Sequence, residues 1–241
     1  MPSRAIWLRT VLRNIGVEVG DHQLETLDAY VALLLEWNKK VNLISRKDEE
    51  NVWENHLLHS LSALARVEIP PGAITLDLGT GGGLPGIPLK ILRPDTEFTL
   101  LDSIQKKITA VRDIVEKLAL TGMTTLCGRA EELGRKGGQR GKYDLVLSRG
   151  VTSLPHLVRL ANPLLRHRSV LRRGEMGRMG AREKRPLSFP ALLAFKGGPL
   201  EAELTKAKRV TTTRCIEVLN LEFAGREGIL LEGKKLVVVE L

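Results

Sequence analysis

Residues 76–86 read Leu-Asp-Leu-Gly-Thr-Gly-Gly-Gly-Leu-Pro-Gly, and this glycine-rich stretch decides the fold. The apolar run at 74–78 predicts a strand before the loop, and residues 88–92 predict a helix after it. Five of the eight residues from Gly79 to Gly86 are glycines. Glycines without Cβ atoms let a backbone turn sharply and approach a ligand closely. We therefore expect a ligand site at the carboxyl end of this strand.

The chain after the loop alternates short apolar runs with helical patterns. The expected strands cover residues 98–102, 124–127 and 145–148, and the expected helices cover residues 106–118 and 154–165. Strands separated by helices form βαβ units in a parallel sheet. A further strand is expected around Lys196, and residues 213–223 and 235–241 are expected to pair as an antiparallel hairpin. The sequence thus predicts an α/β fold with a doubly wound, mostly parallel, seven-stranded Rossmann-like sheet.

The first part of the chain has a different pattern, with apolar residues at helical spacing. We expect helices at residues 3–15, 22–38 and 50–66, with Asp21 as the N-cap of the second one. Pro70, Pro71 and Gly72 end the last of them. The expected organisation is therefore an N-terminal helical cap, residues 1–71, followed by the sheet domain, residues 72–241.

The formal net charge of +9 is concentrated in one segment. Residues 159–185 contain nine basic and only two acidic side chains, whereas the first 70 residues contain eight basic and ten acidic ones. A local basic excess suits a polyanion, although a solvated basic loop explains the same pattern. We expect residues 166–190 to form a mobile basic loop, and we do not expect the cap to be the main polyanion-binding surface.

Other classes of protein are disfavoured by the composition. No stretch reaches the ~18 uncharged apolar residues of a membrane span. Arg4, Arg9 and Arg13 interrupt any signal-peptide core. The two cysteines, Cys127 and Cys215, form neither a disulfide framework nor a metal-ligand cluster. We expect a cytoplasmic protein with no metal site.

The glycine loop by itself fits two cofactors. Gly81-x-Gly83-x-x-Gly86 satisfies a dinucleotide pattern, and Asp102 at the end of the next strand suits the two hydroxyls of a ribose. Asp77 directly before the loop suits the ammonium of S-adenosylmethionine and would repel a pyrophosphate. A nicotinamide enzyme also needs a substrate domain, for which the chain has no room. We therefore predict S-adenosylmethionine.

The chain resembles the RsmG (GidB) family, methyltransferases of bacterial small-subunit ribosomal RNA. The resemblance is carried by these residues in order: Trp37-Asn38-Lys39, Asn42-Leu43, His56, Ser60, the run from Asp77 to Leu89, Leu100-Leu-Asp-Ser103, Lys106-Lys107, Arg129-Ala-Glu-Glu132, Ser148-Arg149 and Lys196-Gly197. The Gly-Leu-Pro-Gly-Ile-Pro segment is far more specific than a generic cofactor loop. The resemblance implies a methyltransferase-type sheet and methyl transfer to N7 of one guanine in 16S rRNA.

The resemblance also implies the roles of individual residues. The cofactor-binding set is Asp77, Gly79, Gly81, Gly83, Leu84, Asp102, Ser103, Ala130, Glu131 and Arg149, with Asp102 at the ribose and Glu131 near the adenine. Arg149, Lys196 and Arg129 are the candidates for positioning the substrate. No general base is expected, because guanine N7 already carries a lone pair.

This chain departs from the family pattern at two positions. The resemblance also implies partners. His59 stands where an aspartate is usual, and Gly150 where an alanine is usual. The implied partner is 16S rRNA, within the 30S subunit or its precursor, and we expect a monomer with no membrane or metal partner. The basic segment is hypothesised to contact the rRNA. The alternatives are a small-molecule methyltransferase of the same fold and a non-catalytic ribosome-assembly factor.

Overall fold

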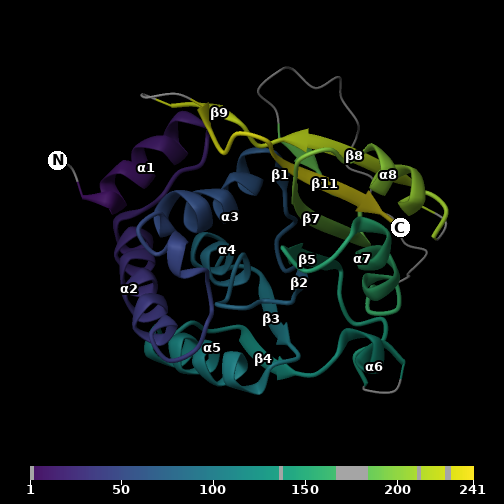
Figure 1. The fold of residues 1–241 in the computed structure, drawn as a ribbon, viewed down its shortest axis with the longest axis horizontal. Coiled ribbons are helices and arrows are strands. Elements are labelled where there is room, and N and C mark those ends of the chain that lie inside the picture. Colours follow the sequence, from purple (N-terminus) through teal and green to yellow (C-terminus); the bar gives the residue numbers. More distant parts are fainter. Residues whose placement is uncertain (1–2, 136–137, 167–183, 211–212, 226–228) are drawn as a thin grey trace.

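A twisted seven-stranded sheet forms the centre of the molecule, as the computed structural model shows (Figure 1). The structure describes residues 3–135, 138–166, 184–210, 213–225 and 229–241. The strands lie in the order β4-β3-β2-β5-β7-β11-β8. β11 runs antiparallel to both of its neighbours, β7 and β8. The other neighbouring pairs are parallel. The predicted doubly wound, mostly parallel sheet is therefore confirmed.

The strands lie close to their predicted positions. They are β2 (Ile74–Leu78), β3 (Glu97–Asp102), β4 (Met123–Cys127), β5 (Leu145–Arg149), β7 (Ala191–Gly197), β8 (Cys215–Asn220) and β11 (Lys234–Glu240). β2, β5, β7 and β11 are buried over most of their length, as expected of strands covered on both faces. The predicted closing hairpin is confirmed by the antiparallel pairing of β11 with β8.

Helices cover both faces of the sheet and create two cores. The domain's helices are α4 (Gly86–Leu92), α5 (Gln105–Lys117), α6 (Ala130–Arg135), α7 (Leu154–Ala161) and α8 (Glu201–Ala207). One core contains residues of α4 and α5 together with the N-terminal helices. The other contains residues of α6, α7 and α8. The short helices α6 and α8 were not expected from the sequence, because six or seven residues hardly show a helical period.

The N-terminal cap contains helices of three kinds. They are α1 (Arg4–Asn14), α2 (Asp21–Asn38), the 3₁₀-helix η1 (Arg46–Asp48), the π-helix η2 (Val52–Leu58), α3 (His59–Leu61) and the 3₁₀-helix η3 (Ser62–Ala65). The N-cap prediction for Asp21 is wrong by one residue. Gly20 precedes α2, and its N–H donates to the Gln23 side chain at 3.0 Å. Asp21 instead forms an ion pair with Arg9.

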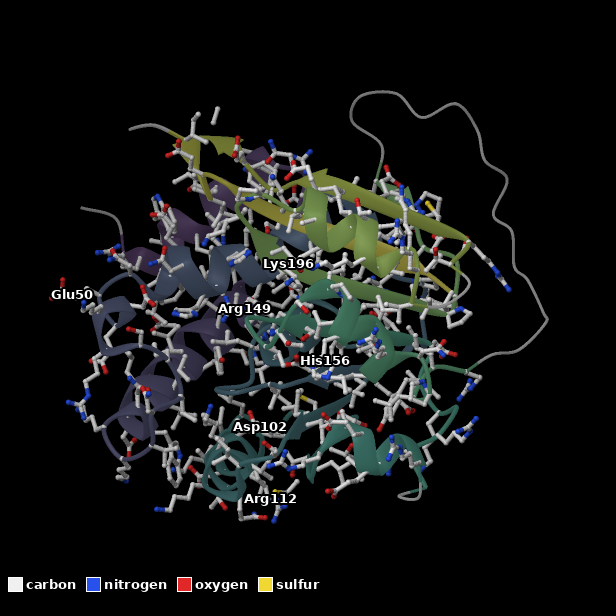
Figure 2. All side chains as sticks on the ribbon, turned by 45° about the vertical axis from the view of Figure 1, so that its right-hand side comes forward. Glu50, Asp102, Arg112, Arg149, His156 and Lys196 are labelled. Carbon is white, nitrogen blue, oxygen red and sulfur yellow. The ribbon has the colours of Figure 1, made fainter. Side chains whose placement is uncertain are left out.

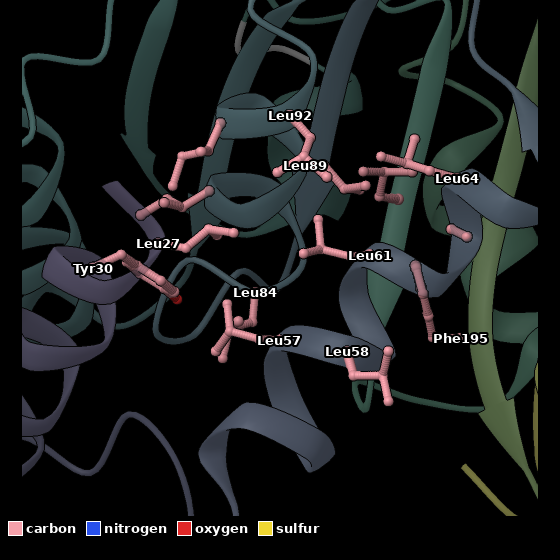
Figure 3. Packing of buried hydrophobic residues seen from close by; sticks show 14 of the residues in the cluster. Leu27, Tyr30, Leu57, Leu58, Leu61, Leu64, Leu84, Leu89, Leu92 and Phe195 are labelled. Carbon is pink, nitrogen blue, oxygen red and sulfur yellow. The ribbon is translucent and has the colours of Figure 1, made fainter. Parts of the chain in front are cut away.

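The cap and the sheet domain share one core (Figure 3). Tyr30 and Leu57 from the cap belong to the same buried cluster as Leu84 of the glycine loop. All three side chains are buried. The proposed division of the chain at residue 71 is therefore not a break in packing. None of the helices in the described part of the chain has the length and hydropathy of a membrane span.

The expected basic loop at 166–190 differs from the structure at its second described end, where a short strand forms. Residues 167–183 lie outside the described residues, and with them most of that prediction. β6 (Arg185–Pro186) pairs in parallel with β1 (Val67–Glu68). Arg185 forms ion pairs with Glu217 and Glu240 at 2.6 and 2.7 Å, and these bonds outweigh burial and raise its pKa.

The remaining two strands outside the central sheet, β9 (Phe223–Ala224) and β10 (Ile229–Leu230), pair in antiparallel orientation.

Candidate functional site at the carboxyl edge of the sheet

Four of the expected site residues stand at or near the carboxyl ends of neighbouring strands. Asp77, Asp102, Arg149 and Lys196 come from β2, β3, β5 and β7. The register places Leu78 beside Leu101 and Ser148, and Arg149 beside Phe195. Figure 2 labels three of these side chains, Asp102, Arg149 and Lys196, along this edge. Parallel strands bring their carboxyl ends to a single edge, and this topology gathers residues far apart in sequence.

The glycine loop turns through conformations that favour glycine. Gly79, Gly81 and Gly83 have φ values of +74°, +57° and +91°. The N–H groups of Gly79 and Thr80 donate to the Leu101 carbonyl at 2.8 and 2.9 Å. These bonds hold the start of the loop against β3. A Cβ on Gly79 would overlap Val151 of the following strand-end loop, so only glycine fits this approach.

Asp77 is fully buried beneath the loop. One carboxylate oxygen, Oδ2, accepts the Thr80 hydroxyl at 2.7 Å and the Gly86 N–H at 2.9 Å. The other oxygen, Oδ1, is buried and has no hydrogen-bond partner among the residues that the structure describes. Burial raises the pKa of Asp77 to about 6, against the lowering effect of these two bonds. An unsatisfied buried carboxylate oxygen at a ligand loop is suited to a donor supplied by a ligand.

Asp102 is held in place by the backbone on both sides of it. Its Oδ2 accepts the Gly81 N–H at 3.1 Å, and its Oδ1 accepts the Ile104 N–H at 2.9 Å. The side chain is only 8% exposed. Each carboxylate oxygen can accept a further bond, so the oriented carboxylate remains able to receive ligand hydroxyls.

The segment after β4 reaches the same edge. Cys127 is in register with Asp102, and the Gly128 N–H donates to the Asp102 carbonyl at 3.0 Å. Ala130 is buried, whereas Arg129 and Glu131 are exposed. The expected adenine-binding residues therefore begin α6, one strand away from the expected ribose-binding residue.

Arg149 is a half-buried cation at the centre of the edge. Its Nη1 donates to the Asn55 carbonyl at 3.2 Å, and its Nη2 lies 2.9 Å from His56 Nδ1. Arginine can only donate, so His56 Nδ1 accepts and the His56 proton is on Nε2. Burial lowers the pKa of Arg149. Within the described residues the guanidinium has no ion pair with a carboxylate, which leaves it suited to an anionic ligand.

Lys196 is already bonded within the protein. Its ammonium donates to the Thr152 carbonyl at 2.8 Å and pairs with Glu203 at 2.8 Å. Glu203 in turn accepts the Leu154 N–H at 2.6 Å. Lys196 thus connects β7 to α7 and α8. Its expected contact with the substrate stays a prediction.

The comparisons with known proteins agree with this geometry. A family model described as rRNA small subunit methyltransferase G matches residues 23–185. That range includes every site residue discussed above except Lys196. The chain belongs to this family.

Two curated members of the family illustrate the extent of the similarity. The protein named Ribosomal RNA small subunit methyltransferase G in Moorella thermoacetica is 39% identical over 69% of this chain and 69% of its own length. The protein of the same name in Bacteroides fragilis is 34% identical over 93% of this chain and 96% of its own length. The fold is also seen in an Agrobacterium tumefaciens structure described as a predicted O-methyltransferase, with a TM-score of 0.52 and 14% identity, covering 76% and 79% of the two chains.

S-adenosylmethionine is the cofactor of this methyltransferase family, and the residues present fit it. The unpartnered Asp77 oxygen suits an ammonium, and the Asp102 carboxylate suits a ribose. The glycines with positive φ lie between these two acids in the site, and because they lack Cβ atoms a ligand can approach their backbone closely. Within the described residues no three His, Cys, Asp or Glu side chains gather in the way a metal site requires.

Sequence reasoning missed two residues of this site. Tyr30 of α2 is fully buried, and its hydroxyl donates to the Gly82 carbonyl at 2.8 Å. Tyr30 lies within the helix expected at residues 22–38, but a helical period does not show which loop the helix covers. His56 matches the family pattern in the sequence, but the sequence does not show that its ring accepts from Arg149. The sequence signal for it was weak, because a histidine on a helix is compatible with a place in the core as well as with a place in the site.

Proposed function

We propose that this protein transfers a methyl group from S-adenosylmethionine to N7 of a guanine in 16S rRNA. The observation that carries the proposal is the family match over residues 23–185, which includes the cap from α2 onward, the glycine loop and the strand ends through Arg149. The curated relatives are named as methyltransferases of the same ribosomal subunit. N7 as the acceptor atom comes from the resemblance to the RsmG (GidB) family.

The proposal assigns the cofactor to the carboxyl edge of the sheet. In this proposal Asp77 holds the ammonium, and the backbone of Gly79, Gly81, Gly83 and Leu84 lies along the methionine part. Asp102 receives the ribose hydroxyls, with Ser103 beside it. Ala130 and Glu131 meet the adenine at the start of α6.

The reaction requires the guanine to be positioned against the methyl group, and it does not require acid–base catalysis. S-adenosylmethionine supplies an electrophilic methyl group when it is bound. Guanine N7 attacks with its own lone pair, so no residue needs to remove a proton before transfer. The purine becomes positive, and Arg149 therefore serves best at the guanine O6, at a phosphate or at the cofactor carboxylate rather than at N7. Arg129 and Lys196 are the further positioning candidates.

The partner in this proposal is the small ribosomal subunit. The substrate is 16S rRNA in the 30S particle or its precursor, and the reaction takes place in the cytoplasm, where subunits are assembled. The protein acts as a monomer and without a metal ion.

The proposal is tested by methyl transfer from tritiated S-adenosylmethionine to unmodified 16S rRNA and to 30S subunits. N7-methylguanine makes the strand cleavable by reduction and aniline, which locates the label. We expect one labelled guanine, and no label with Asp102→Ala. An exposed acid changed in the same way, Asp28→Ala, is the matched control and should retain transfer.

Each other outcome points to a different function. Label on a metabolite but none on rRNA would make the protein a small-molecule methyltransferase. Tight cofactor and rRNA binding without any transfer would make it an assembly factor. Nicotinamide binding with no binding of S-adenosylmethionine in calorimetry would overturn the cofactor assignment.

A further inference from the structure

A basic segment of the cap lies beside the cofactor loop, and the function proposed above does not use it. Residues 39–47, here named the rim segment, connect α2 to η1 and include its first two residues. The segment contains Lys39, Lys40, Arg46 and Lys47 and no acidic residue. All four basic side chains are exposed.

Of the three acids that directly follow the rim segment, Asp48 and Glu49 are bonded within the protein, whereas Glu50 is exposed. Glu49 accepts from the buried Asn38 side chain at 2.6 Å. Asp48 accepts from the Asn55 side chain at 3.0 Å and lies 3.8 Å from His56 Nε2. The formal charge of the whole cap is slightly negative, but the surface of the rim segment is locally positive.

One surface ion pair involves the rim segment. Lys40 lies 3.7 Å from Glu36, and both side chains are more than half exposed. Exposed pairs of this kind contribute about 0–1 kcal/mol, so a phosphate can replace Glu36 at little cost.

The rim segment has a fixed backbone. The Asn38 side-chain oxygen accepts the N–H groups of Leu43 and Ile44 at 2.8 and 3.0 Å. Leu43 and Ile44 are themselves buried in the core shared by the cap and the sheet. A surface ordered before binding loses less entropy when a ligand arrives.

A cavity of about 420 Å³ opens on the rim segment. It is lined by Asn38, Lys39, Lys40, Asn42, Ser45 and Arg46. Three of these side chains are cations, the other three are neutral and polar, and none is acidic. Cations with neutral donors form the usual contacts of proteins with phosphate and sugar.

The rim segment, on which the cavity opens, is in contact with the glycine loop. The Leu43 carbonyl lies 3.6 Å from the position of a Cβ built on Gly81, and the Leu43 Cβ lies 3.3 Å from one built on Gly82. The rim segment therefore packs directly on the glycine loop. The rim segment is therefore a neighbour of the loop that is expected to hold the cofactor.

We propose that the rim segment is a phosphate-binding surface that binds the rRNA backbone beside the target guanine. This inference rests on the proposed function and assigns it an RNA contact in the cap. Lys39, Lys40 and Arg46 neutralise phosphates at the cavity, and Asn42 and Ser45 donate to phosphate or sugar oxygens. The charge-rich segment 159–185 is not needed for this contact.

The test removes three charges from the rim with Lys39→Gln, Lys40→Gln and Arg46→Gln together. Affinity for 16S rRNA is measured over a series of salt concentrations. Each lost phosphate contact lowers the slope of log affinity against log salt by about 0.7–0.9, so three contacts lower it by about 2–3. We expect affinity near physiological salt to fall about 10- to 100-fold. Affinity for S-adenosylmethionine, measured by calorimetry, should not change.

The matched control removes the same charge at the opposite edge of the sheet. Lys206, Lys208 and Arg209 are exposed at the end of α8, which runs back from the carboxyl end of β7 to the start of β8. Replacing these three by glutamine should leave affinity within about twofold of the wild type.

A third variant changes two rim residues but keeps their positive charge. The variant Lys39→Arg with Lys40→Arg should bind as the wild type does, because the phosphate contact needs charge. If the rim variant and the α8 variant showed the same affinity and the same salt slope, the proposal would be overturned. Failure of the proposed function is separate, since it appears as absent methyl transfer by the wild-type protein.

Discussion

Asp77 illustrates how one buried side chain serves both the fold and the ligand. One oxygen holds Thr80 and Gly86, and these bonds shape the glycine loop. The other oxygen has no hydrogen-bond partner in the described part of the chain. Burial raises the pKa to about 6 from 3.8, so the charged form is costly until a cation arrives.

Replacing Asp77 by asparagine should change the pH dependence of stability. A raised folded pKa contributes stability that is complete below pH 3.8 and is lost as pH rises through about 6. The wild type should therefore lose up to about 3 kcal/mol over this window through this group. Asp77→Asn should not show that loss in urea unfolding, whereas the exposed control Asp28→Asn should behave as the wild type does.

The same variant tests the ligand contact. An ammonium beside Asp77 stabilises its charged form, so wild-type affinity for S-adenosylmethionine should rise between pH 5 and 7. Asp77→Asn should bind the cofactor about tenfold or more weakly and without that rise. Unchanged affinity would show that Asp77 only shapes the loop.

Gly86 offers a second test at the scale of a residue. A Cβ there would lie 2.5 Å from Leu100 Cδ2 and 2.8 Å from Asp77 Oδ2, and both neighbours are buried. Gly86→Ala should cost about 1–3 kcal/mol of unfolding free energy and weaken cofactor binding, because Asp77 must move. Gly20→Ala is the control, since its nearest neighbour lies at 3.6 Å. It should cost about 0.5 kcal/mol and leave cofactor affinity unchanged.

At the scale of an element, the π-helix η2 determines how Arg149 is held. π-helical turns are rare and occur often at functional sites. Here the turn presents the Asn55 carbonyl and the His56 ring to the same guanidinium. Burial lowers the pKa of His56 to about 4, with Arg149 as the next cause. The neutral ring is the form that can accept from arginine.

Acid should therefore destabilise this element. A lowered folded pKa contributes stability that is present above pH 6.5 and is lost as pH falls through about 4. His56→Gln keeps an acceptor for Arg149 but does not titrate. It should lose less stability than the wild type between pH 6.5 and 4, by up to about 3 kcal/mol. The exposed control His22→Gln should follow the wild type, and an identical acid profile for His56→Gln would contradict this account.

At the scale of the whole molecule, the cap forms one wall of the cofactor loop. Tyr30 bonds Gly82, and Leu34 and Leu43 lie so close that Gly82 has no space for a Cβ. Because the cap and the sheet share a core, a change in the packing of the cap should alter cofactor binding even when no substrate is present.

Removing one hydroxyl tests this coupling. Tyr30→Phe deletes the bond to Gly82 and should weaken cofactor binding about 5- to 10-fold, at a stability cost of about 1–2 kcal/mol. Tyr143→Phe deletes an equally short bond, to Gln139 at 2.8 Å, on the other side of the sheet. It should leave cofactor affinity unchanged, and equal effects of the two variants would show that Tyr30 acts only through stability.

Local patterns were sufficient to predict most of the fold. The strands β2 to β5 and the helices α2 and α5 have long or regular apolar periods, and their predicted bounds agree with the structure within a few residues. The π-helical winding of residues 52–58 and the strand at Arg185 were not predictable. The first differs from an α-helix by only one residue per turn, and the second exists only because β1 lies beside it.

The amino-acid sequence by itself determined the parallel sheet, the glycine loop and the two acids that flank it, because these depend on periodicity and on residue types at short spacing. Only the tertiary structure decided what surrounds that loop. It placed Tyr30 on Gly82 and His56 on Arg149, bonded Lys196 internally, and brought the basic rim segment to the cofactor loop. Such contacts join residues from distant parts of the chain, and no local pattern specifies which of them meet. The glycine loop is therefore recognisable in the sequence alone, while its partners come from folding.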